Sequence, residues 1–223
     1  MRFTDQTVSV VIGGTSGIGK AVADALSQRP GRVEIASRKT GLDIADDAIV
    51  EAWFERFGTI DHVIVTAGSQ APGGKVTDVS LEAARAAFDV KFWGAIAAVR
   101  AAAPHVRKGG TITLTSGFLA RRAVPGAYVK TAMNAALEAV AKVLARELSP
   151  IRVNVISPGL TDTEAYAGMA DDARKAMLAR AAATLPAGAH GQPQDLAAAY
   201  LFAIDNPFVT GSVIDVEGGA LIT

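Results

Sequence analysis

The sequence predicts one α/β domain, residues 1–223, built on a doubly wound parallel β-sheet. Short β-branched runs alternate strictly with alanine-rich stretches of helical length, as expected when helices cover both faces of a parallel sheet. The strand-like runs are apolar nearly throughout, so we expect them to be buried on both faces. The 223 residues suffice for one such domain with a large core, and neither a linker nor a repeat divides them.

Strands and helices are expected in regular alternation along the chain. The expected strands are residues 7–13, 31–37, 61–68, 110–117, 151–159 and 212–219. The expected helices are residues 18–28, 46–57, 80–103, 127–147 and 193–204. Between Arg38 and residues 42–44 the chain is too short for the crossover of about a dozen residues that joins adjacent parallel strands. The crossover after the second strand is therefore predicted to be shortened, lacking a helix or a helix and a strand.

Composition favours a small-molecule partner. Lys plus Arg and Asp plus Glu are equal at 22 each, so no global positive charge indicates a nucleic acid or an anionic membrane. The chain has no cysteine and three scattered histidines, so we predict neither disulfides nor a metal site. No apolar run reaches the roughly 18 residues of a transmembrane helix. The N-terminal residues lack the layout of a signal peptide, so a cytoplasmic location is expected.

A glycine-rich loop lies between the first predicted strand and the first predicted helix. In the segment VVIGGTSGIGK, Gly13, Gly17 and Gly19 allow a tight turn and a close approach of backbone N–H groups to a ligand. The N-terminus of the following helix adds about half a positive charge. This combination predicts that the first βα unit binds the phosphates of a dinucleotide.

Four segments, in the right order, resemble the short-chain dehydrogenase/reductase family. They are GGTSGIG (13–19), TAG (66–68), SPGLTDT (157–163) and VTGSVIDVEGG (209–219). Two positions depart from the family pattern, with Ile12 in place of a usual threonine and Thr66 in place of an asparagine. The resemblance covers essentially the whole chain and implies a Rossmann-type fold and a nicotinamide cofactor. The cofactor contacts it implies in these segments are Gly13, Thr15, Ser16, Gly17, Ile18, Gly19, Ala67, Gly68, Pro158, Gly159, Thr161 and Thr163.

The end of the second predicted strand indicates which cofactor binds. An acidic residue here would accept hydrogen bonds from the ribose 2′-OH of NAD, whereas a 2′-phosphate requires cations. This chain has Ser37 followed by Arg38 and Lys39, whose charges suit a phosphate. NADP(H) is therefore expected in preference to NAD(H). Asp43 and Ile44 resemble the family's adenine-binding aspartate and its neighbour.

The catalytic positions of the family are only partly matched. In this family an asparagine, a serine, a tyrosine and a lysine assist the reduction of a carbonyl: the nicotinamide supplies the hydride, the tyrosine donates the proton, and the lysine lowers the pKa of the tyrosine. Ser116, at the end of a predicted strand, resembles the serine. In FDVKFWGAI, which is similar to the family's Val-Asn-x-x-Gly, Lys91 stands at the asparagine position.

The segment GAYVKTAMNAALEA (126–139) admits two alignments. With Tyr128 as the tyrosine, Ala132 stands at the lysine position. With the flanking residues aligned instead, Lys130 stands at the tyrosine position and Asn134 at the lysine position. The second alignment exchanges an asparagine and a lysine between two helices. We therefore expect Lys91 to supply the charge that contacts the nicotinamide ribose of the cofactor and tunes the acid, and Asn134 to replace the polar bridge.

The identity of the proton donor stays open between Tyr128 and Lys130. Tyr128 lies six residues before Asn134, about 120° away around a regular helix. Lys130 lies four residues before Asn134, on the same helical face, and a neighbouring ammonium would lower its pKa.

The expected activity is hydride transfer from NADPH to a small ketone, aldehyde or diketone. The alternative is a nucleotide-sensing or structural protein of the same fold that has lost catalysis. Residues 161–193 occupy the place of the family's substrate lid. Tyr166, Met169 and Met177 are candidates to line a pocket there, but most of them are expected to belong to an amphipathic helix packed on the core. Phe92 and Trp93 suit the core or a subunit interface as well as they suit substrate contacts, and the family resemblance implies a homodimer or homotetramer.

Overall fold

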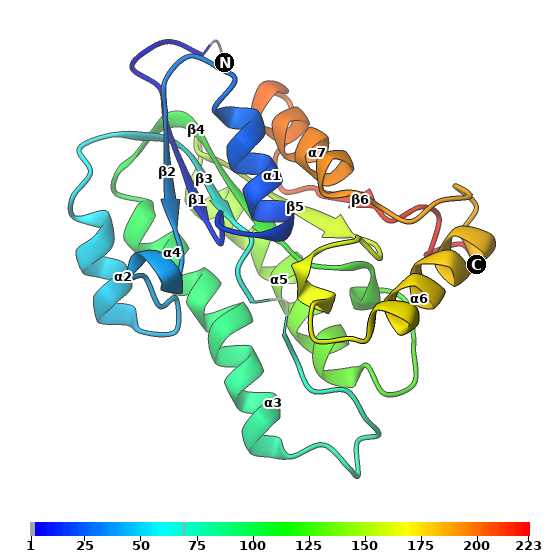
Figure 1. Ribbon diagram of the computed structural model, residues 1–223. Helices are drawn as coiled ribbons and strands as arrows, with labels where there is room; N and C mark the ends of the chain where they lie inside the picture. The colour runs from blue at the N-terminus through cyan, green and yellow to red at the C-terminus, as the bar shows by residue number, and fades with distance from the viewer. Residues whose placement is uncertain (1–2, 69) are drawn as a thin grey trace.

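The computed structural model describes residues 3–68 and 70–223, which form a six-stranded sheet of order β2-β1-β3-β4-β5-β6 (Figure 1). Every pair of neighbouring strands is parallel. The strands are β1 (Val8–Ile12), β2 (Arg32–Ala36), β3 (Ile60–Val65), β4 (Val106–Thr115), β5 (Arg152–Pro158) and β6 (Val213–Val216). The predicted α/β class with a doubly wound parallel sheet is confirmed.

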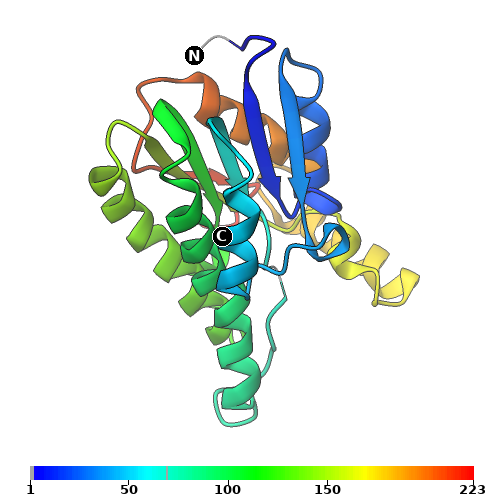
Figure 2. The same cartoon turned by 90° about the vertical axis from the view of Figure 1, so that its left-hand side faces the viewer.

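Helices cover both faces of this sheet. One face carries α1 (Gly17–Leu26) and α7 (Pro193–Asp205), and the other carries α2 (Asp47–Phe54), α4 (Gly94–Ala102) and α5 (Tyr128–Glu147) (Figures 1 and 2). Successive side chains of a strand point to opposite faces. Val11 accordingly packs with Val22 and Tyr200 on the first face, while Val10 packs in the core on the second.

Burial of the strands depends on their place in the sheet. Every residue of β1, β3 and β5 is buried, as the apolar runs predicted. The prediction is wrong for β2 and β6, whose residues are mostly half-buried or exposed. These two strands are the edges of the sheet, so each has a neighbour on one side only and is covered less completely by helices.

The connection from β2 to β3 is short. It contains the 3₁₀ turn η1 (Arg38–Thr40) and helix α2, and β3 pairs with the far side of β1. Within the described residues no strand lies between β2 and β3, and β2 ends the sheet. The expected shortened crossover is therefore present.

The helix predicted at 80–103 is a continuous helical run with a change of pitch at its middle. It consists of α3 (Leu81–Phe88), a π-helical turn η2 (Asp89–Trp93) and α4. The hydroxyl of Ser80 caps its start by accepting a hydrogen bond from the N–H of Ala83. A π turn is wider than an α turn and is frequent at functional sites. Lys91 lies at the centre of this turn.

The predicted lid differs from expectation. It contains the 3₁₀ turn η4 (Glu164–Tyr166) and helix α6 (Asp171–Thr184), which extends away from the sheet (Figure 1). Among the described residues of α6, Leu178 alone is buried, so the expected packing of an amphipathic helix on the core is wrong. The sequence DDARKAMLARAAAT explains this, because charged and small residues surround the helix and leave no continuous apolar stripe.

Arg152 fastens the end of α7 to the sheet. This residue is the first of β5, and its guanidinium donates to the carbonyl oxygens of Ala203, Ile204 and Val209 at 2.6, 2.6 and 2.9 Å. Carbonyl groups at the end of a helix have no partner within the helix, so this cation stabilises them. Across residues 3–68 and 70–223, no helix combines the length and apolar character that a membrane span requires.

Candidate functional site

The predicted phosphate loop is packed tightly between β1, α1 and the end of β3. The N–H of Gly13 donates to the carbonyl of Ala36 at 2.7 Å, and its φ is +89°. A Cβ on Gly13 would lie 2.5 Å from Oγ1 of Thr66, and a Cβ on Gly19 would overlap both that oxygen and the carbonyl of Gly13. Close packing against Thr66 therefore requires glycine at both positions and fixes the path of the loop backbone.

The other loop residues lie at the start of α1. Ser16 is exposed at the N-cap position, while Thr15 and Ile18 are half-buried. Gly17 has a φ of +53°, in the region that glycine tolerates best.

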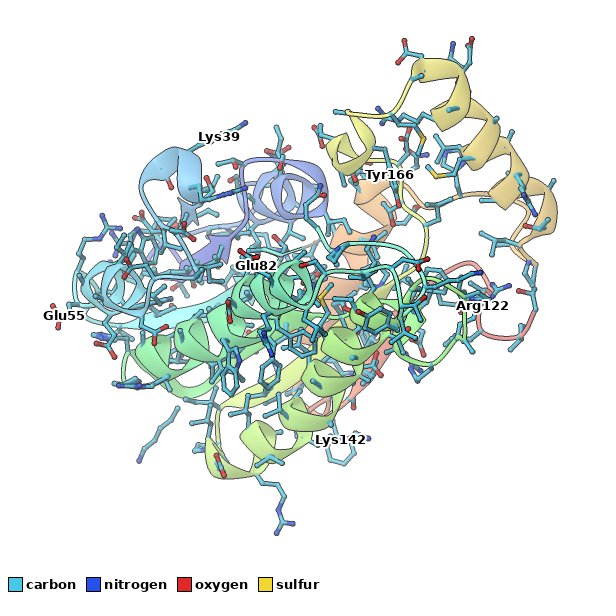
Figure 3. The ribbon with its side chains drawn as sticks, turned by 90° about the horizontal axis from the view of Figure 1, so that it is seen from below. Lys39, Glu55, Glu82, Arg122, Lys142 and Tyr166 are labelled. Carbon is cyan, nitrogen blue, oxygen red and sulfur yellow. The ribbon has the colours of Figure 1, made fainter. Side chains whose placement is uncertain are left out.

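The residues predicted to select the cofactor form a rigid turn beside this loop. Ser37 accepts from the N–H of Lys39 at 3.1 Å, and the hydroxyl of Thr40 accepts from the N–H of Ser37 at 2.8 Å. These reciprocal bonds cap η1 and leave Arg38 and Lys39 exposed. Figure 3 shows Lys39 extending from η1, with α1 lying between this turn and the turn that carries Tyr166.

The segment after η1 is anchored on the opposite side. Ile44 is buried, and a Cβ on Gly94, the first residue of α4, would lie 2.7 Å from its carbonyl oxygen. The neighbouring Asp43 is exposed, and its Oδ1 accepts from the N–H of Ala45 at 3.1 Å.

Lys91 is buried where the π turn meets the end of β3. Only 4% of the residue is exposed. A Cβ on Gly68 would lie 2.8 Å from Cα and 3.2 Å from Cδ of Lys91, so the glycine leaves the space that this side chain crosses. Burial, together with the positive charge of Lys130, lowers the pKa of Lys91 to about 8. The structure thus brings two of the predicted catalytic residues together.

Asn134 lies on α5 next to the ends of β4 and β5. It is buried, and its Nδ2 would be 2.9 Å from a Cβ placed on Gly117. That same Cβ would lie 3.8 Å from the carbonyl oxygen of Pro158. The predicted amide is therefore adjacent to the segment predicted to contact the nicotinamide.

Ser116 is buried, and its hydroxyl donates to Oε1 of Glu138 at 2.8 Å. Glu138 is one helical turn beyond Asn134 and also pairs with Arg121, whose Nε lies 3.1 Å from Oε2. Arg121 in turn donates to Asp215 of β6 and pairs with it, and this pairing raises the pKa of the guanidinium. Sequence reasoning missed Glu138 and Arg121, because both look like ordinary surface charges of a helix and a loop.

The two candidate proton donors have different surroundings. Tyr128, the first residue of α5, packs in an apolar cluster with Val129, Met133 and residues of α3. Its hydroxyl is buried and finds no hydrogen-bond partner among the described residues. Lys130 is half-buried and close enough to Lys91 for its charge to lower that residue's pKa.

The segment after β5 passes from the sheet to the phosphate loop. Pro158 is buried at the end of β5, and the N–H of Gly159 donates to Val216 at 2.9 Å. Thr161 is buried and donates to the carbonyl of Gly159 at 3.1 Å. Thr163 reaches the loop, since its Cβ would lie 3.4 Å from a Cβ on Gly17.

Two further predicted contacts, Ala67 and Gly68, are half-buried just beyond β3. In the described part of the chain, no three His, Cys, Asp or Glu side chains gather closely enough to hold a metal ion.

Comparison with known proteins finds relatives along almost the whole chain. Residues 37–220 match the family model described as enoyl-(acyl carrier protein) reductase. An uncharacterized oxidoreductase of Methylorubrum extorquens is 35% identical, over 98% of this chain and 99% of its own. Carbonyl reductase family member 4 of Danio rerio is 29% identical, over 95% and 97% of the two chains. The crystal structure of a small-chain dehydrogenase in complex with NADPH superimposes with a TM-score of 0.96 at 57% identity, covering 98% of this chain and 100% of that one.

Proposed function

The chain belongs to the short-chain dehydrogenase/reductase family of oxidoreductases, and on this premise we propose that it uses NADPH to reduce a small ketone, aldehyde or diketone. The cofactor assignment is supported by the similar structure solved with NADPH. It is also supported by the exposed Arg38 and Lys39 and by the absence of an acid at position 37. NAD(H) suits these residues less well, because its ribose 2′-OH would meet cations instead of an acceptor.

The residues of the site suit such a cofactor. The backbone between Gly13 and Gly19 would hold the diphosphate, since a Cβ at either glycine would collide with Thr66 or with the carbonyl of Gly13 and displace the loop. Arg38 and Lys39 would hold the 2′-phosphate. The segment from Pro158 to Thr163 would lie along the nicotinamide. When bound, the cofactor supplies the hydride.

The single observation that carries the catalytic proposal is the proximity of the Lys130 charge to Lys91, which is buried beside Gly68. The positive charge of Lys130 lowers the pKa of Lys91. We assign proton donation to Nζ of Lys130, because it lies near Lys91, whereas the Tyr128 hydroxyl is enclosed in an apolar cluster. Lys91 keeps a positive charge near the reacting carbonyl, and the Asn134 amide supplies a neutral hydrogen-bonding group.

Ser116 has a restricted part in this scheme. A hydroxyl carries one hydrogen, and that of Ser116 is directed to Glu138. Toward the substrate the oxygen can then only accept a hydrogen bond. The lysines therefore polarise the carbonyl oxygen of the substrate. Ser116 can orient a hydrogen-bond donor by accepting from it.

The test is NADPH oxidation with a panel of small ketones, aldehydes and diketones, followed by single-turnover hydride transfer in two variants. Lys130→Met should slow the transfer by about 100-fold or more, the usual contribution of a general acid. Tyr128→Phe, which keeps the ring in its cluster, should change it by less than about threefold. The reverse ranking of the two variants would make Tyr128 the donor.

A nucleotide-sensing protein without catalysis is the second candidate function. Two observations favour it: the Tyr128 hydroxyl is enclosed and the Ser116 hydroxyl is engaged with Glu138. Tight NADPH binding without oxidation by any member of a broad panel would support this candidate over the reductase.

We also propose that the chain forms a homodimer or homotetramer. Trp93 on η2 and Val143 on α5 are 58% and 51% exposed, which suits association through these helices. Light scattering of the purified protein measures the assembly directly, and a monomer mass would refute the proposal.

A further inference from the structure

A carboxylate of the chain itself lies at the N-terminus of α1. The N–H of Gly17, the first residue of this helix, donates to Oε2 of Glu164 at 2.8 Å. The preceding residue, Thr163, also lies against Gly17. Segment 163–164, from the start of the predicted lid, therefore contacts the phosphate loop.

The helix end that Glu164 contacts has few other partners. The first turn of α1, Gly-Ile-Gly-Lys, contains no acidic residue, and within the described residues the Ser16 side chain makes no capping hydrogen bond to it. The positive end of a helix dipole attracts an anion, and a charge-assisted bond to a backbone N–H is stronger than a neutral one. Glu164 supplies that anion, and a cofactor diphosphate bound at the same end would repel it.

Glu164 belongs to a segment that can move without disturbing the core. Its side chain is exposed, and α6 beyond it extends away from the sheet (Figures 1 and 3). The base of the segment is fixed separately, by the backbone bridge between Thr161 and Gly191 and by the ion pair of Arg174 with Asp162. Release of Glu164 therefore breaks one exposed hydrogen bond and leaves the base intact.

We propose that Glu164 is an internal competitor for the cofactor diphosphate. In the ligand-free protein its carboxylate occupies the N-terminus of α1, and the diphosphate displaces it. Cofactor binding then releases segment 163–166 from the phosphate loop, which couples occupation of the cofactor site to the position of the predicted lid. This inference rests on the cofactor assigned in the proposed function, and it adds a residue that sets the affinity for that cofactor.

The test is calorimetric measurement of nucleotide affinity for the full chain and three variants. Glu164→Gln and Glu164→Ala remove the carboxylate, and Glu55→Gln, an exposed acid at the end of α2, is the matched control. Two ligands are used: NADPH, and adenosine 2′-monophosphate, which has the 2′-phosphate but no diphosphate. Both variants at position 164 should bind NADPH about five- to tenfold more tightly than the wild type. Their affinity for adenosine 2′-monophosphate, and both affinities of Glu55→Gln, should equal those of the wild type.

Three results would overturn the inference, each for a different reason. Unchanged or weaker NADPH binding by both variants would mean that Glu164 does not compete with the diphosphate. An equal gain for both ligands would indicate a general charge effect in place of competition. Failure of both nucleotides to bind any form of the protein would refute the proposed cofactor itself.

Discussion

Replacing Lys91 by methionine is expected to stabilise the protein while removing its activity. Burial lowers the pKa of this lysine from 10.5 to about 8, and the charge of Lys130 contributes to the shift. A shift of one pKa unit corresponds to about 1.4 kcal/mol, so the charged Lys91 destabilises the folded state by about 3 kcal/mol at neutral pH. Methionine has a similar unbranched stem and no charge, so the variant should unfold at a higher denaturant concentration.

The stabilisation should depend on pH in a defined direction. Below pH 8 both folded and unfolded chains carry the ammonium, and the full penalty of burying it is present. Between pH 8 and 10.5 the unfolded chain keeps a proton that the folded chain has lost, so wild-type stability rises with pH. The advantage of Lys91→Met should thus be about 3 kcal/mol at pH 7 and about 1 kcal/mol at pH 9.5, measured by urea unfolding.

An exposed lysine provides the control for this experiment. Lys142→Met on α5 should alter stability by less than about 0.5 kcal/mol at both pH values. Lys91→Met should also lower NADPH oxidation by about 100-fold. A Lys91→Met variant that is less stable than the wild type at pH 7, or whose gain in stability is equal at the two pH values, would contradict this prediction. Unchanged turnover would remove Lys91 from the proposed catalytic site.

Three more predictions concern the frame around the site. Burial lowers the pKa of His62 to about 4, so as pH falls below 6.5 the unfolded chain takes up a proton before the folded chain does. The unfolding free energy of the wild type should therefore drop by about 3 kcal/mol between pH 6.5 and pH 4. The variant His62→Gln should show a weaker pH dependence in urea titrations. Arg152→Met leaves three backbone carbonyls near the end of α7 without their guanidinium, and should lower the unfolding free energy by about 3 kcal/mol; a loss below about 1 kcal/mol would mean that water replaces it. Gly19→Ala forces a methyl group against the carbonyl of Gly13 and should abolish NADPH binding in calorimetry, whereas Gly58→Ala, whose Cβ meets no atom within 4 Å, should bind normally.

The order of strands and helices could be predicted because each element depends on the apolar pattern of a short stretch of sequence. A run such as VSVVI is apolar on both faces, and only a central parallel strand buries both. The run RVEIA looks similar, yet β2 is an edge, and the same holds for VIDV of β6. Position in the sheet is set by which strands pair, and pairing joins segments far apart in the chain. The packing of α6 on the core was predicted wrongly for a different reason. Its alanines permit a helix but provide too little apolar surface to hold that helix on the core.

The site could be predicted where one motif supplies both residue type and position. Lys91 and Asn134 are both buried, beside Gly68 and Gly117 respectively, and their sharing of one pocket stays a prediction. The carboxylates could not be predicted. Ser116 and Glu138 are 22 residues apart, and Gly17 and Glu164 are 147 apart. Neither glutamate differs in sequence from a solvated surface charge, and only the folded arrangement directs one to a buried hydroxyl and the other to a helix end.

The stability penalty at Lys91 bears on the choice between a reductase and a sensor. A buried ammonium that destabilises the fold by about 3 kcal/mol removes a substantial part of the 5–15 kcal/mol typical of a domain. The surroundings all accommodate it: a π turn places Lys91 toward the sheet, and Gly68, with a φ of +86°, leaves the space for its stem. Both features are locally less favourable than an α turn and a residue with a Cβ. Unfavourable local backbone conformations and a loss of overall stability, both caused by one buried charge, are expected where that charge has a function. A protein that only binds the nucleotide could hold its phosphates with the loop and with the exposed Arg38 and Lys39, without such a penalty, so the position of Lys91 favours the reductase.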